Sequence, residues 1–134
     1  MIICSDAAWK EDLRAAGLGW TISNQELGLK LARSETRNHV GSPLVAEAMA
    51  LLAALRHAKT LQLTMVTAFS DSQELIKSLN GRPSDKHLYG VLHDIMSIRD
   101  LFSSISFYYV PRKNNGEADS LAKRALTTSE PGLL

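Results

Sequence analysis

The first third of the chain has the short hydrophobic period of β-strands. Apolar residues dominate residues 1–9 and 17–22, and they alternate with charged residues over 27–36. Polar turns at 10–14 and 24–26 join these segments. We therefore predict three antiparallel strands that follow one another as a meander.

The next part of the chain changes to a helical period. Ser42 and Pro43 are typical of a helix start, and apolar residues recur at helical spacing to about His57. A second helix is predicted to begin at Asp71-Ser72 and to end at Asn80-Gly81.

Two buried strands and two further helices complete the predicted order. The strands are short apolar runs at residues 65–69 and 105–110, and the helices are amphipathic segments at 88–102 and 115–126. This order predicts an α/β fold with a mixed five-stranded sheet. The first three strands are expected to be antiparallel and the later ones parallel, with helices flanking the sheet.

The composition is that of one globular domain. The chain has 134 residues, of which 45% are apolar and 22% charged. We predict one domain over residues 1–126 and a disordered tail over 127–134. The formal charge of +1 excludes a strongly basic nucleic-acid wrapper, but it does not exclude a local basic patch. No apolar run is long enough to span a membrane, and the single cysteine, Cys4, favours an intracellular, reducing compartment, either nucleus or cytoplasm.

Four acidic residues are placed where the predicted fold can bring them together. Asp6 and Asp71 follow buried strands, and Glu47 and Asp119 lie one turn into helices. The outgoing ends of strands are the usual site of chemistry in open α/β sheets. Converging carboxylates repel one another, and such hard oxygen ligands favour Mg²⁺ or Mn²⁺. Each acid also has an ordinary explanation. Asp6 and Asp71 could be turn or cap residues, with Asp71 well suited to a helix N-cap, and the two helical acids suit the positive ends of their helices.

Short motifs around these acids occur in a characteristic order. They are Asp6-Ala-Ala-Trp9, Ala16-Gly-Leu-Gly-Trp20, Ala46-Glu-Ala48, Ser70-Asp-Ser-Gln73 and Arg112-x-x-Asn115-x-x-Ala118-Asp119-Ser-Leu-Ala-Lys123. The set resembles the ribonuclease H superfamily, and most of all the reverse-transcriptase-like ribonuclease H domains of plant non-LTR retroelements and related proteins. The resemblance covers residues 1 to about 126.

The resemblance implies a ribonuclease H fold and an endonuclease that cleaves the RNA strand of RNA–DNA hybrids, leaving a 5′-phosphate. It implies two Mg²⁺ ions as cofactor, for which Mn²⁺ can substitute, and a hybrid nucleic acid as partner. The sequence does not fix the oligomeric state, although a monomer is favoured. Asp6 and Asp71 match the central metal ligands. Glu47 matches the ligand on the leaving-group side, and Asp119 the ligand of the ion that activates water.

The resemblance also suggests substrate contacts for Gln73, Arg112 and Asn115. Some features depart from the family pattern, however. Ala7 stands where the family usually has glycine, and the loop before the last acid has no histidine. The basic insertion of some members is replaced by a short loop at residues 82–86. The alternative hypothesis is therefore a catalytically weak or inactive module that binds nucleic acid or acts as a scaffold.

The remaining candidate residues have ordinary explanations. Trp9 and Trp20 could stack on bases, but packing against the sheet is the more common role. The four histidines form no zinc-binding pattern, and His57 lies at a helix end where a positive charge would complement the dipole. Cys4 is expected to act as a small buried apolar residue.

Overall fold

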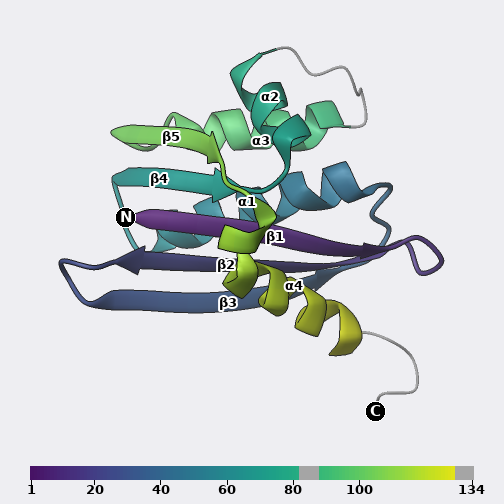
Figure 1. Ribbon diagram of the computed structural model, residues 1–134. Helices are drawn as coiled ribbons and strands as arrows, with labels where there is room; N and C mark the ends of the chain where they lie inside the picture. Colours follow the sequence, from purple (N-terminus) through teal and green to yellow (C-terminus); the bar gives the residue numbers. More distant parts are fainter. Residues whose placement is uncertain (82–87, 129–134) are drawn as a thin grey trace.

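The computed structural model describes residues 1–81 and 88–128 (Figure 1). The predicted loop at 82–86 and residues 129–134 of the predicted tail lie outside the described residues. The elements are β1 (Ile2–Lys10), β2 (Ala15–Asn24), β3 (Leu29–Arg37), α1 (Pro43–Thr60), β4 (Met65–Ser70), α2 (Gln73–Asn80), α3 (Tyr89–Arg99), β5 (Ser104–Tyr109), a short 3₁₀ helix (Arg112–Asn114) and α4 (Gly116–Thr128). This order confirms the predicted α/β class.

The five strands form one mixed sheet in the order β3-β2-β1-β4-β5. β1, β2 and β3 are antiparallel neighbours, whereas β4 runs parallel to β1 and β5 runs parallel to β4, as predicted. The parallel pairing of β1 with β4 ends where Ser5 lies opposite Ser70. Asp6 and Asp71 are the residues that follow Ser5 and Ser70, so the register of β1 on β4 places these two acids side by side.

Helices cover both faces of the sheet. Figure 1 shows α4 crossing one face over β1, β2 and β3, with α1 and α3 behind the other face and α2 beside β5. α1 is rich in buried alanines, and these small side chains let it lie close to β1 and β2. The largest fully buried side chains, among them Ile3, Leu18, Leu51 and Leu55, fill the space between α1 and the sheet.

α4 lies against β2 with backbone touching backbone. A Cβ atom at Gly17 would lie 2.0 Å from the Ala122 carbonyl oxygen, and one at Gly19 would lie 2.5 Å from the Ala118 carbonyl oxygen. Only a residue without a Cβ allows this approach. The two glycines therefore fix the distance of α4 from the sheet, and with it the position of the Asp119 backbone.

Three helix ends differ from the sequence prediction. α1 continues to Thr60 and α4 to Thr128, each slightly beyond its predicted end. α3 instead ends at Arg99, three residues early. A turn follows the helix, in which the Phe102 N–H donates to the Arg99 carbonyl oxygen. This turn places the Phe102 ring in the core, which is why Phe102 continues the apolar pattern of the sequence although it lies outside the helix.

None of the helices in the described part of the chain is both long and apolar enough to cross a membrane.

Candidate active site

A cleft of about 830 Å³ opens at the meeting point of β1, β4 and the N-terminal ends of α1 and α2. Its polar lining includes Asp6, Glu47, Asp71, Gln73, Glu74, Tyr109 and Arg112. Five of the seven predicted site residues are in this set, and they come from four separate parts of the chain.

Three carboxylates converge in the cleft. Asp6, Glu47 and Asp71 each place an oxygen atom within 4.8 Å of the other two. Asp6 is 5% exposed, and the side chain of Asp71 is 3% exposed. The predicted convergence of these three acids is therefore present in the structure.

Serine residues, rather than these acids, cap the two nearby helices. The Ser42 hydroxyl accepts a hydrogen bond from the Val45 N–H at the start of α1, and the Ser72 hydroxyl accepts one from the Leu75 N–H at the start of α2. The ordinary explanation of Asp71 as an N-cap is thus wrong, because its neighbour takes that role. Capping by serine leaves the Asp71 carboxylate available to the cleft.

Two buried oxygens of the cluster lack a hydrogen-bond partner. Among the described residues nothing donates to Glu47 Oε1 or to Asp71 Oδ2, whereas Asp6 Oδ1 accepts a 2.9 Å bond from the Ala7 N–H. Burial raises the pKa of Glu47, and the negative charges of Asp6 and Asp71 raise it further. Burial also raises the pKa of Asp6, with Asp71 acting in the same direction. Buried acids of this kind favour either a proton or a cation.

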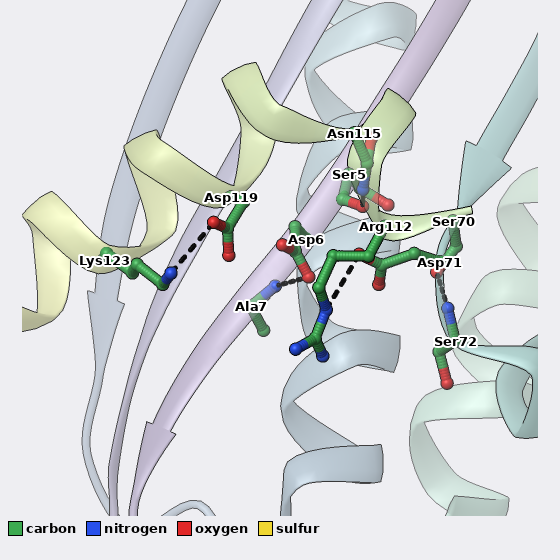
Figure 2. Close-up of polar contacts among 10 residues, drawn as sticks. All are labelled: Ser5, Asp6, Ala7, Ser70, Asp71, Ser72, Arg112, Asn115, Asp119 and Lys123. Atoms are coloured by element: carbon green, nitrogen blue, oxygen red, sulfur yellow. Dashed lines mark hydrogen bonds and ion pairs between the residues drawn. The ribbon is translucent and has the colours of Figure 1, made fainter. Parts of the chain in front are cut away.

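Asp119 lies beside Asp6, outside the three-carboxylate cluster. It projects from the first turn of α4, and hydrogen bonding with it raises the pKa of Asp6. Its Oδ2 atom is 3.0 Å from the Lys123 Nζ one turn further along (Figure 2). The fourth predicted acid is therefore close to the cluster, with a lysine as its present partner.

Two of the predicted substrate-contact residues lie at the cleft. Gln73 is an exposed residue at the start of α2. Arg112 extends toward the cluster in Figure 2, with its Nε 3.8 Å from Asp71 Oδ2, although its side chain is 86% exposed. An ion pair this exposed adds little stability, so the guanidinium remains available to an anionic ligand.

Asn115, the third predicted substrate contact, lies outside the lining of the cleft. It is 2% exposed, and its Nδ2 donates a 3.0 Å hydrogen bond to the Ser5 carbonyl oxygen (Figure 2). Asn115 ties the chain just before α4 to β1, one residue before Asp6.

Trp9, which was considered for base stacking as well as for packing, lines the cleft while its Nε1 donates to the Val40 carbonyl oxygen at 2.8 Å. It therefore has the packing role that was predicted and also faces the cleft. Glu74 and Tyr109 line the cleft too, and neither was identified from the sequence. Tyr109 ends β5 opposite Ser70 of β4, so the strand-end argument used for the acids would also have identified it.

Trp20 is 3% exposed, which confirms its predicted packing role. Its Nε1 donates to His57 Nδ1 at 3.0 Å. Burial and the charge of Arg33 lower the pKa of His57. The imidazole at this helix end accepts a hydrogen bond through Nδ1, which disfavours the positive charge that would complement the helix dipole. Cys4 is half-buried, and burial raises the pKa of its thiol.

Sequence comparison finds relatives over nearly the whole chain. A family model described as reverse transcriptase-like matches residues 4–125. The bifunctional protein Rv2228c of Mycobacterium tuberculosis is 27% identical over 128 residues, which cover 94% of this chain and 35% of that protein. An uncharacterized protein of Mycobacterium bovis matches to the same extent. The chain thus spans about a third of the length of the curated relatives that it matches.

Solved structures share the fold. Ribonuclease H1 of the halophilic archaeon Halobacterium salinarum superposes with a TM-score of 0.88 at 26% identity, covering 96% of this chain and 98% of that one. The N-terminal ribonuclease H domain of Rv2228c gives 0.85 at 25% identity, covering 95% and 93%. LC11-RNase H1 in complex with an RNA/DNA hybrid gives 0.85 at 23% identity, covering 96% and 97%, and bears on the fold alone.

Proposed function

The chain belongs to the reverse transcriptase-like family and has the fold of ribonuclease H, and from this premise we propose that it is a divalent-metal-dependent endonuclease that cleaves the RNA strand of RNA–DNA hybrids. In the proposed reaction a water oxygen bonds to the phosphorus, the bond from phosphorus to O3′ breaks, and the products carry a 5′-phosphate and a 3′-hydroxyl. The observation that carries the proposal is the convergence of Asp6, Glu47 and Asp71, of which Asp6 is buried and the other two are partly buried.

The residues of the cluster fit a divalent cation. Glu47 Oε1 and Asp71 Oδ2 are buried without a hydrogen-bond partner in the described chain, and oxygen donors of this kind are the ligands that Mg²⁺ and Mn²⁺ prefer. Asp6, Glu47 and Asp71 would hold one ion, and Asp119, beside Asp6, would help to hold a second. When bound, two such ions activate the attacking water and stabilise the leaving oxygen.

The remaining cleft residues support a nucleic acid as the substrate. Arg112 presents a planar guanidinium beside the acids, which suits an RNA phosphate approaching them. Gln73 lies at the start of α2, where its amide can both donate to and accept from a nucleotide. Tyr109 is 43% exposed and offers a ring face at the same opening. These three side chains would orient the strand over the carboxylates.

Cleavage of an end-labelled RNA–DNA hybrid tests the proposal. The wild-type protein should release RNA fragments ending in a 5′-phosphate with Mg²⁺ or Mn²⁺ and none with EDTA. Asp71→Asn should lose at least about a hundredfold in rate, since metal ions supply several kcal/mol of transition-state stabilisation. Asp94→Asn removes one charge from an exposed position on α3 and should retain the wild-type rate. Equal rates for the two variants would overturn the assignment.

A binding module without activity is the second candidate. It is favoured by Ala7, which puts a methyl group in the lining of the cleft directly after Asp6. Incubation with duplex DNA, duplex RNA and hybrid, each at several divalent-ion concentrations, separates the two candidates. Hybrid binding with no product under any of these conditions would favour the module over the nuclease.

A further inference from the structure

A second cavity, of about 300 Å³, lies between the edge strand β3 and the C-terminal half of α1. It is on the face of the sheet opposite α4. Thr36 of β3 donates to the Ala125 carbonyl oxygen of α4, and side chains alternate along a strand, so its neighbours Glu35 and Arg37 face the α1 side. The cavity shares no lining residue with the cleft.

The lining of this cavity is positively charged. It contains three arginines, Arg33 and Arg37 from β3 and Arg56 from α1, against one carboxylate, Glu35. Arg37 forms an ion pair with Glu35. Arg33 donates to the Ala32 carbonyl oxygen, and neither it nor Arg56 has a carboxylate partner among the described residues. Two guanidinium charges are therefore left without a counter-charge.

The base of the cavity is fixed and supplies a further donor. Trp20 and His57 meet there edge to face, with ring centroids 6.1 Å apart. The Trp20 Nε1–H donates to His57 Nδ1, so a neutral imidazole carries its own proton on Nε2. The ring can then donate to an anion without itself being charged.

We propose that this cavity, which we call the arginine pocket (Arg33, Arg37, Arg56 and His57), binds a phosphate group of a nucleic acid outside the cleft. Guanidinium forks match phosphate oxygens, and three arginines line this cavity. The assignment of this phosphate to a nucleic acid rests on the proposed function. Arg56 is nine residues beyond Glu47 on α1, which is about 14 Å along the helix axis. Phosphates repeat at every nucleotide of a strand, so a strand held at the cleft has another phosphate about 14 Å away after a few nucleotides.

Titration with inorganic phosphate tests the pocket independently of any cleavage. The chain has two tryptophans, so the two indole N–H signals in a ¹H–¹⁵N spectrum report separately on the pocket (Trp20) and the cleft (Trp9). At constant ionic strength, phosphate should shift the Trp20 signal saturably. Arg56→Gln should weaken this binding about tenfold, since charged hydrogen bonds are strong. Arg99→Gln, an equal loss of charge outside the pocket, should leave it unchanged.

A hybrid titration then tests the source of the phosphate. It uses Asp71→Asn to prevent cleavage. Hybrid should shift the Trp20 signal, and adding Arg56→Gln should weaken hybrid binding and reduce its dependence on salt. A phosphate response without a hybrid response would overturn the assignment to nucleic acid, as would a response to an acidic peptide alone. No saturable phosphate response would overturn the pocket itself, whether or not the protein cleaves hybrids.

Discussion

Replacing Gly19 by alanine should displace α4 and destabilise the fold. The new Cβ would lie 2.5 Å from the Ala118 carbonyl oxygen and 2.6 Å from the Ala122 nitrogen, whereas ordinary contact begins at 3.4 Å. All of these are backbone atoms, which no side-chain rotation can move aside. α4 would therefore have to retreat from β2 by close to 1 Å, and a gap of that size removes a quarter to a half of the local dispersion attraction.

The expected net loss is about 1–3 kcal/mol in the free energy of unfolding, which is typical of overpacking in a well-packed core. Alanine also restricts the unfolded chain, which offsets about 0.4–1 kcal/mol of the clash. The displacement matters for activity as well, because α4 carries Asp119 next to Asp6. Hybrid cleavage should therefore fall even at temperatures where the variant is fully folded.

Urea unfolding followed by circular dichroism measures the loss of stability. Gly90→Ala is the matched control, since a Cβ at this position of α3 meets nothing within 4 Å. That control should be neutral or slightly stabilising, because alanine favours a helix over glycine by about 1 kcal/mol. If Gly19→Ala unfolds within about 0.5 kcal/mol of the wild type, the close backbone packing of α4 on β2 is refuted.

Asp71→Asn should make the metal-free protein more stable by about 1 kcal/mol at pH 8, since it removes a charge next to two other acids. In the wild type, Mn²⁺ should raise the melting temperature by about 5–10 °C, and Asp71→Asn should abolish this rise. Equal Mn²⁺ shifts in both proteins would contradict this. The pKa of His57 is lowered on folding from 6.5, so the unfolded chain takes up the proton first and stability falls as the pH drops through 6.5. Urea unfolding at pH 7.5 and 5.5 should reveal this component in the wild type and not in His57→Gln, and an identical pH dependence would argue against it. Asn115→Ala should lower the free energy of unfolding by about 1–3 kcal/mol, because the buried Ser5 carbonyl loses its donor; a change within error in urea unfolding would exclude this bond as a tie between α4 and β1.

The convergence of the acids could be predicted from local rules. Asp6 and Asp71 each follow an apolar strand, and parallel neighbours end at one edge of a sheet. Ser42-Pro43 fixed the start of α1 and hence the place of Glu47 in its second turn. These local rules place each acid at the end of its own element, and the pairing of β1 with β4 then brings Asp6 and Asp71 together.

Side-chain environments could not be predicted in the same way. Asn115 belongs to a motif that suggested a substrate contact, but its partner is a carbonyl group 110 positions earlier in the chain. His57 ends a helix where a charge would be favourable, yet Trp20, on another element, requires it as an acceptor. The end of α3 was missed for a similar reason, since Phe102 reaches the core from a turn. In each case a distant tertiary contact outweighs the local preference.

The carboxylate cluster is better explained by function than by stability. Three acids share one buried site, two of their oxygens have no partner in the described chain, and serines already cap the neighbouring helices. Without a cation this arrangement opposes folding, because burial and mutual repulsion both disfavour the charged form. Packing elsewhere in the fold must offset this unfavourable free energy. The alanine-rich contact of α1 and the glycine contact of α4 hold Glu47 and Asp119 close to Asp6 by backbone position. Apolar residues at these positions would favour the stability of the metal-free fold, so the presence of three acids in a tightly packed site supports a cation-binding role.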